Sequence, residues 1–155
     1  MKIKTIAACS LALAALAGTS SVQAKGGKVA PVITENVDFA AKQVQLMVDT
    51  MDTFKDIPSP RTTDKDGRLV FTTLDDWTSG FFPGTLWYLY ELTGDDKWLE
   101  PAVHYTEGME RIKYYRGNHD IGFMIFCSFG NGLRLTDKQS YKDVIVTAAR
   151  TLSER

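Results

Sequence analysis

The sequence predicts an all-α fold built from antiparallel helical hairpins, and two observations lead to this prediction. First, apolar residues recur at steps of three and four along most of the chain, which is the spacing of one face of an α-helix. Second, an almost uncharged helix is followed by an amphipathic one, and this plan occurs twice at an offset of 43 residues. A period of this length is typical of proteins built from repeated helical pairs.

The chain is expected to begin with a secretory signal peptide over residues 1–24. Two lysines give it a basic start, Ile6 to Ala17 form a short apolar run, and small residues precede the expected cleavage after Ala24. The apolar run is shorter than the roughly 20 residues that a membrane-spanning helix needs. The sequence therefore predicts a protein exported to the periplasm or secreted, with no membrane attachment after cleavage.

Residues 25–35 are expected to be a flexible leader, and the helical pattern begins at Asn36. Asn36 can cap the first helix because its side-chain oxygen can accept a hydrogen bond from a free N–H group of the first turn. The apolar stripe of this helix consists of Val37, Ala40, Ala41, Val44, Met47, Val48, Met51 and Phe54. Residues 59–69 are predicted to be a polar loop with a turn at Asp66-Gly67.

The first predicted hairpin pairs two unlike helices. Phe81 to Leu92 form the first helix, and Gly80 and Gly84 are expected to permit close approach of a neighbouring helix. Glu91 is its only charge, and a helix that is apolar on every side is expected to be buried on every side. The second helix, about 97–115, is amphipathic. Its predicted buried stripe is Trp98, Ala102, Tyr105, Met109 and Ile112.

The second predicted hairpin repeats this plan. Ile121 to Leu135 are again almost uncharged, Tyr141 to Leu152 are amphipathic, and Asp76-Trp77 align with His119-Asp120 at the same offset. Such hairpins occur in open superhelices of the armadillo type and in closed α/α barrels. The uncharged first helices favour the barrel, where they form the inner ring, because the concave helices of a superhelix normally carry polar binding faces.

Composition and cysteine count argue against several classes of protein. The formal net charge of −1 is too small to indicate nucleic-acid binding, which needs a concentrated basic face. After signal cleavage, Cys127 is the sole cysteine of the sequence, so no internal disulfide is expected. No Cys/His cluster has the spacing of a metal site, and no metal ligands are predicted.

Polar residues lead into both uncharged helices. Asp75, Asp76 and Trp77 precede the first, and His119 and Asp120 precede the second. In a barrel these leading segments meet at one end and would line a common cleft. The aspartates can be explained as helix caps alone. A second explanation adds sugar binding, because an indole ring stacks on a sugar ring while carboxylates accept hydrogen bonds from its hydroxyl groups. His119 can serve the fold as a hydrogen-bonding group or carry a positive charge toward an acidic substrate.

Two sequence blocks carry a resemblance to a known family. "DWTSGFFPGTLWYLYELTGD" followed by "NHDIGFMIFCSFGNGLRLT" is similar, in order and in spacing, to the N-terminal part of the unsaturated glucuronyl hydrolases, glycoside hydrolase family 88. The resemblance covers about residues 36–153. It implies a barrel of six hairpins that acts without a metal or organic cofactor. It also implies, as partner, an oligosaccharide with a 4,5-unsaturated uronic acid at its non-reducing end, as polysaccharide lyases leave behind.

The resemblance implies hydration chemistry and residue roles. An acid protonates the C4=C5 bond, water adds at C5, and the resulting hemiketal opens and releases the next sugar. Asp120 would be one of two important carboxylates and is the predicted catalytic residue. Trp77 would line the subsite for the unsaturated ring, and His119 and Asp76 complete the predicted substrate-binding set. The second carboxylate, the usual proton donor, would fall beyond Arg155 in this numbering.

The sequence therefore predicts an incomplete (α/α)6 barrel, about half of the full ring, over residues 36–155, truncated before the donor and inactive alone. An alternative is a non-catalytic exported helical-repeat module that binds glycan or protein. A third alternative is a related uronidase of the rhamnogalacturonan type, against which the H-D-I-G-F block argues. Heparinoid, chondroitin and other lyase products all fit the predicted substrate class, and the oligomeric state stays open.

Overall fold

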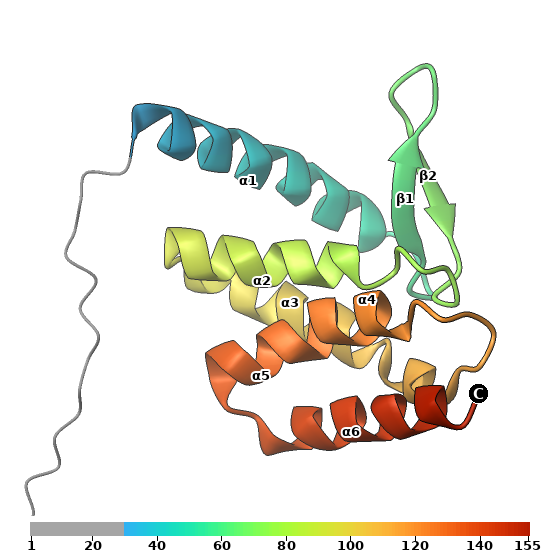
Figure 1. Ribbon diagram of the computed structural model, residues 1–155. Helices are drawn as coiled ribbons and strands as arrows, with labels where there is room; N and C mark the ends of the chain where they lie inside the picture. Colours follow the sequence, from blue (N-terminus) through green and yellow to red (C-terminus); the bar gives the residue numbers. More distant parts are fainter. Residues whose placement is uncertain (1–29) are drawn as a thin grey trace, which may run out of the picture.

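The computed structural model describes residues 30–155 as layered helices with one protruding β-hairpin (Figure 1). The elements are α1 Pro31–Met51, β1 Ser59–Thr63, β2 Leu69–Thr72, α2 Phe81–Thr93, η1 Asp96–Trp98, α3 Leu99–Glu107, η2 Glu110–Tyr114, α4 Ile121–Ile125, η3 Phe126–Gly130, α5 Asn131–Thr136 and α6 Gln139–Ser153. The predicted signal peptide and residues 25–29 of the predicted leader lie outside the described residues. None of the helices in the described part combines the length and the apolarity needed to cross a membrane.

Helix α1 begins earlier than the sequence pattern predicts. Its first residue is Pro31, whose fixed φ suits the first turn of a helix and whose missing N–H group would have no partner there in any case. Residues 31–35, which the prediction assigned to the leader, are therefore helical. Asn36 lies inside the helix instead of capping it, and its amide donates to the carbonyl of Val32 at 2.7 Å. The buried residues of α1 all belong to the predicted stripe: Val44, Val48 and Met51.

The segment predicted to be a polar loop forms the antiparallel hairpin of β1 and β2. Its threonine, valine and phenylalanine residues favour extended backbone, which the loop prediction neglected. The turn is built by Asp64, whose Oδ1 accepts hydrogen bonds from the N–H groups of Asp66 and Arg68, each at 2.9 Å. Gly67 has a φ of 79°, a conformation that favours glycine. The predicted turn at Asp66-Gly67 is thus confirmed, and its flanks pair as strands.

Helices α2 and α3 form the first predicted hairpin. Helix α2 ends with Gly94 in the left-handed conformation, which closes the helix as a glycine at this position commonly does. The single helix predicted over 97–115 is interrupted, because Gly108 separates α3 from η2. Glycine weakens a helix interior, and here it also admits the side chain of Ile57, which a Cβ atom at position 108 would overlap. All five residues of the predicted stripe from Trp98 to Ile112 are buried.

The second uncharged helix runs continuously from α4 through η3 to α5 and contains one π-helical turn, η3. Such a turn inserts a residue into the helix and is frequent at functional sites. The hydroxyl of Ser128 donates to the carbonyl of Met124 at 2.7 Å, and the amide of Asn131 donates to the carbonyl of Cys127 at 2.9 Å. The predicted boundaries of this helix hold to within one residue, whereas periodicity gave no sign of the π-turn.

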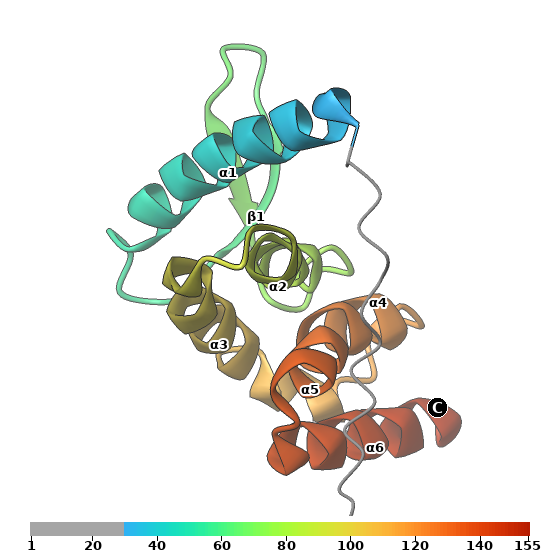
Figure 2. The same cartoon turned by 90° about the vertical axis from the view of Figure 1, so that its left-hand side faces the viewer.

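The two hairpins and α1 share one core, with α2 at its centre. Figure 2 looks along α2 and shows α1 on one side of it and α3 and the α4–α5 helix on the other. Trp87 of α2 is fully buried and donates its indole N–H to the hydroxyl of Thr106 in α3 at 2.8 Å. The outer helices are joined as well, because Lys138 and Tyr141 both donate to the carboxylate of Glu107.

The two uncharged helices lie side by side in parallel and in register with the sequence repeat. Four contacts join residues that are 43 positions apart: Asp75 with Asn118, Gly80 with Phe123, Gly84 with Cys127, and Glu91 with Arg134. At the two glycines the backbones meet, since added Cβ atoms would overlap carbonyl groups of the neighbouring helix. The offset in the sequence therefore corresponds to one lateral step between equivalent helices, and the predicted packing role of Gly80 and Gly84 is confirmed.

The apolar pattern of α2 taken alone predicts burial on every side, whereas an inner helix of a partial barrel is expected to expose uncharged surface on its open side, and α2 is in fact exposed on one side. One stripe of its surface remains exposed in the described structure, and the exposed apolar surface continues onto Phe123 and Phe126 of the neighbouring helix. The exposed stripe consists of Phe81, Thr85, Tyr88 and Leu92. The apolar periodicity of the sequence could not reveal this exposed face, because the sequence pattern of an apolar helix face is the same whether or not another element covers it.

Candidate functional site

The segments that lead into α2 and α4 lie on the same side of the molecule, beside the β-hairpin, at the right of Figure 1. We call these segments, residues 75–80 and 118–121, the mouth. The ring of Trp77 lies 6.2 Å from that of Phe123, and Phe81 lies 5.7 Å from Trp77 and 6.0 Å from Phe123, measured between ring centroids. Trp77 is 41% exposed and Phe123 49%. The mouth therefore presents an open aromatic surface that joins the two hairpins.

Asp120 lies directly before α4, with a side chain that is 25% exposed. It occupies the cap position, but its carboxylate accepts no capping hydrogen bond, so capping alone does not account for this residue. His119 lies beside Asp120, with its Nε2 3.5 Å from Oδ1 and its side chain 79% exposed. Within residues 30–155, Asp120 forms no ion pair with a lysine or arginine. Its carboxylate is available to a ligand.

Asp76 is engaged by the protein itself. One carboxylate oxygen accepts hydrogen bonds from the backbone N–H and the hydroxyl of Thr78, and the other accepts from Nε of Arg61 at 3.2 Å. Partial burial opposes ionisation of the carboxyl, but these hydrogen bonds and the arginine charge outweigh it and lower the pKa of Asp76. The geometry gives Asp76 a local capping function and ties the mouth to strand β1, which carries Arg61.

Two further residues, which the sequence pattern did not single out as site residues, hold the mouth together. Arg111 of η2 places a guanidinium nitrogen 2.9 Å from the carboxylate of Asp75. The amide of Asn118 donates to the backbone carbonyl of Asp75 at 3.3 Å, while its side-chain oxygen accepts from the N–H of Asp120 at 2.9 Å. Asn118 precedes the H-D-I-G-F block directly, and an asparagine can accept a hydrogen bond from the N–H two residues further on, which is a signal for such a turn.

We expect Asp76→Asn to lower the free energy of unfolding by about 1 kcal/mol at neutral pH, because it weakens the bond to a partly exposed arginine. The folded pKa of Asp76 lies below its ordinary value of 3.8, so this stabilisation is present above that value and is lost as the pH falls through the folded pKa. Chemical unfolding at a series of pH values should show wild type and variant converging in acid. Asp120→Asn is the matched control and should change stability little. A gap between wild type and Asp76→Asn that persists in acid would contradict the assignment.

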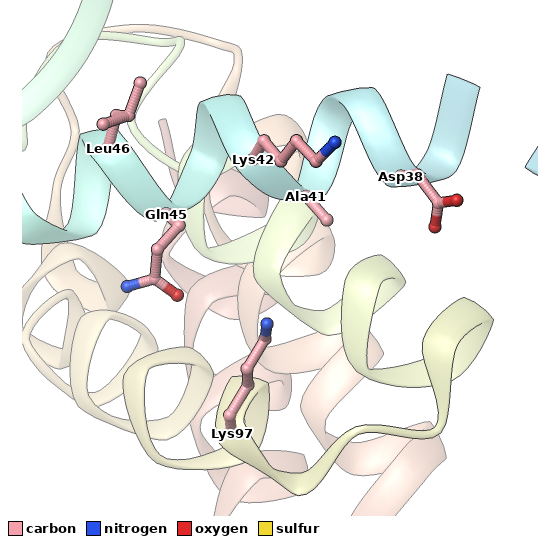
Figure 3. A pocket seen from close by; sticks show the side chains of 6 residues that line it. All are labelled: Asp38, Ala41, Lys42, Gln45, Leu46 and Lys97. Carbon is pink, nitrogen blue, oxygen red and sulfur yellow. The ribbon is translucent and has the colours of Figure 1, made fainter. Parts of the chain in front are cut away.

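Two hollows of the described structure lie away from the mouth, beside α1. A groove of about 510 Å3 runs between α1 and η1, where Lys97 extends toward α1 and faces Lys42 and Gln45 (Figure 3). A second hollow of about 410 Å3 beside α3 shares Gln45 and Lys97 with it. Neither is lined by a predicted site residue, and exposed side chains form most of the wall of the first hollow and half of the wall of the second. Among residues 30–155, no three His, Cys, Asp or Glu side chains are gathered as metal ligands would be.

Comparisons with known proteins agree with the two sequence blocks. No model of a known protein family matches the chain. An unsaturated glucuronyl hydrolase of Formosa agariphila is 52% identical over 81 residues, which are 52% of this chain and 20% of the relative. An unsaturated chondroitin disaccharide hydrolase of Streptococcus pyogenes serotype M1 is 34% identical over 128 residues, 79% of this chain and 31% of the relative.

The fold is similar as well. The crystal structure of an unsaturated glucuronyl hydrolase specific for heparin matches with a TM-score of 0.70 and 35% identity, over 79% of this chain and 32% of the solved one. The chain thus spans between 20% and 32% of the length of these relatives. In sequence and in fold, this chain is a homologue of the unsaturated glucuronyl hydrolases, a family of glycoside hydrolases, and corresponds to a third or less of their length.

Proposed function

We propose that the mouth is one side of a binding site for a 4,5-unsaturated uronic acid at the non-reducing end of an oligosaccharide. Trp77 stacks on the sugar ring, and Asp120 accepts hydrogen bonds from its hydroxyl groups. His119, when protonated, attracts the uronate carboxylate. Asp76 contributes at the rim through its partly exposed carboxylate, which Arg61 and Thr78 hold in place.

The register of α2 against α4 is the observation that carries this proposal. Residues 43 apart lie side by side, so the segments that carry Trp77 and Asp120 are neighbours, and the ring of Trp77 lies 6.2 Å from that of Phe123, three residues after Asp120. An exposed indole beside an uncommitted carboxylate combines an apolar surface with a hydrogen-bond acceptor, which are the two groups that a sugar ring with its hydroxyls needs. The relatives are named for unsaturated glucuronyl and unsaturated chondroitin substrates, which supports the substrate class.

The proposed reaction in the protein as a whole is hydration of the C4=C5 bond. A carboxylic acid delivers a proton to C4, and the oxygen of a water molecule bonds to C5 while its second proton is taken up by a base. The hemiketal formed at C5 then opens and releases the next sugar, so one water is consumed for each bond broken. Asp120 would bind and orient the ring during these steps.

The proton donor is proposed to come from helices outside this chain's match to its relatives. Of the other two carboxylates of the mouth, Asp76 has a pKa that is lowered, despite partial burial, by its bonds to Thr78 and Arg61, which makes it a poor acid, and Asp75 lies 2.9 Å from a guanidinium nitrogen of Arg111. In the proposed complete barrel, further hairpins cover the exposed stripe of α2 and bring a second carboxylate toward Asp120. On this proposal the chain by itself is an incomplete barrel that binds the sugar without converting it.

The test is a titration of the chain with unsaturated chondroitin disaccharide, in which binding is monitored through tryptophan fluorescence. Trp87 and Trp98 are buried, so the response should come from the exposed Trp77. We expect Trp77→Ala to weaken binding by about tenfold or more, as truncation of an aromatic contact residue commonly does. Phe39→Ala, which removes an exposed aromatic ring from α1, should leave binding unchanged. Equal affinities of wild type and Trp77→Ala, measured by calorimetry, would rule out the proposed stacking.

A further inference from the structure

We propose that Asn118 is a positioning residue that holds the aromatic side and the carboxylate side of the mouth in a fixed relation. It is neither the stacking residue nor a charged group. The inference rests on the proposed function for its consequence in sugar binding, but its structural content can be tested without a ligand.

The side chain of Asn118 makes three hydrogen bonds, of which one is a long contact from its amide to Sδ of Met124 at 4.0 Å and the other two run in opposite directions. Its side-chain oxygen accepts a hydrogen bond from the backbone N–H of Asp120 at 2.9 Å. This bond forms a side-chain-to-backbone turn over residues 118–120 and fixes the backbone conformation at Asp120, and with it the direction of the Asp120 side chain. Its amide donates to the carbonyl of Asp75 at 3.3 Å, two residues before Trp77. One planar group thus bridges the leading segments of α2 and α4.

The amide group is the residue type that such a bridge requires, because it carries a donor and an acceptor at a fixed separation. An aspartate at position 118 would keep the acceptor for the Asp120 N–H but would turn an oxygen toward the Asp75 carbonyl. The carboxylate of Asp75 lies on the same residue, so the charge change would also be repulsive there. Asn118→Asp therefore removes the bridge between hairpins and keeps the local turn, whereas Asn118→Ala removes both.

The contacts around Asn118 indicate why the position matters for a ligand. The rings of Trp77 and Phe123 touch across the same junction, and Phe123 follows Asp120 by less than one helical turn. A small separation of the two segments would move the indole relative to the carboxylate. A sugar ring that must contact both groups at once would lose one of them, as misplacement of a positioned group by about 1 Å is costly.

The first measurement is hydrogen exchange resolved to single amides, on the chain at micromolar concentration. Asn118→Ala should speed exchange of the Asp120 amide and of the amides of residues 76–79 by about fivefold to tenfold, the value of one net hydrogen bond. Asn118→Asp should speed exchange only at 76–79 and leave the Asp120 amide protected. Asn36→Asp, the same change at an exposed asparagine of α1, should alter neither segment. Unchanged exchange at 76–79 in Asn118→Asp would overturn the bridge.

The second measurement is binding of unsaturated chondroitin disaccharide to the same variants and to a Trp77→Ala background. Asn118→Asp should weaken binding about tenfold with Trp77 present and have little effect without it, because it acts through the position of that ring. Equal losses in both backgrounds would show a general structural effect and overturn the positioning role. If wild type does not bind the disaccharide, the proposed function of the chain fails, while the exchange pattern still decides whether Asn118 fixes the mouth.

Discussion

Asp120→Asn is expected to lower kcat/KM for unsaturated chondroitin disaccharide by about 100-fold or more, since loss of a group that orients the reacting ring is costly on this scale. The reaction would be measured in a chimera in which residues 30–155 replace the segment of the Streptococcus pyogenes relative that they match, by following loss of the absorbance of the unsaturated ring. Asparagine keeps the shape of the side chain but removes its charge. The accompanying loss of stability should be small, because the Asp120 carboxylate makes no capping hydrogen bond.

Asp76→Asn in the same chimera is the matched control for this loss. It should affect stability more than activity, because its carboxylate is already bonded to Arg61 and Thr78. The two substitutions thus separate the carboxylate proposed to orient the ring, Asp120, from Asp76, which is held by the protein and contributes only at the rim. Full activity in Asp120→Asn would show that the site is assigned to the wrong residue. Titration of the isolated chain with the disaccharide gives a second readout, in which Asp120→Asn should weaken binding, should the chimera fail to fold.

Gly80→Ala is expected to reduce the free energy of unfolding by about 3 kcal/mol or more, the upper part of the range for overpacking. A methyl group at this position would overlap the backbone carbonyl groups of Phe123 and Met124. Backbone cannot swing aside as a flexible side chain can, so α2 and α4 would have to separate along their shared edge. The same separation would move Trp77 away from Phe123, whose rings lie 6.2 Å apart.

Two further glycines give a graded series of controls. A Cβ atom at Gly84 would lie 2.9 Å from the carbonyl oxygen of Cys127, so Gly84→Ala should cost less than Gly80→Ala. A Cβ atom at Gly122 would meet nothing within 4 Å, and Gly122→Ala should leave stability unchanged or raise it by up to about 1 kcal/mol. The free energies of unfolding of the variants would be compared from the midpoints of denaturant unfolding curves, with the same dependence on denaturant concentration used for all of them. Equal stability of Gly80→Ala and Gly122→Ala would contradict backbone contact between the two helices.

The candidate site was predictable in part. Trp77, His119 and Asp120 could be named because the residues before two equivalent helices of a repeat must fall at equivalent places, and the offset of 43 aligned them. Asp76 was named on the same argument, but its bonds to Arg61 and Thr78 were not foreseen. Arg61 belongs to a segment that reads as a polar loop, and no periodic pattern links it to position 76.

By itself, the sequence determined the helical class, the two hairpins, their buried stripes and the residues that lead into the inner helices. These features follow from local periodicity and from the repeat, which every part of the chain carries independently of its distant neighbours. Only the tertiary structure decided which carboxylate of the mouth stays uncommitted, where the glycines let two backbones meet, and which stripe of α2 remains exposed. Those outcomes depend on pairs such as Asp76 with Arg61 and Asp75 with Asn118, and a contact between residues far apart in the chain exists only once packing has fixed their distance.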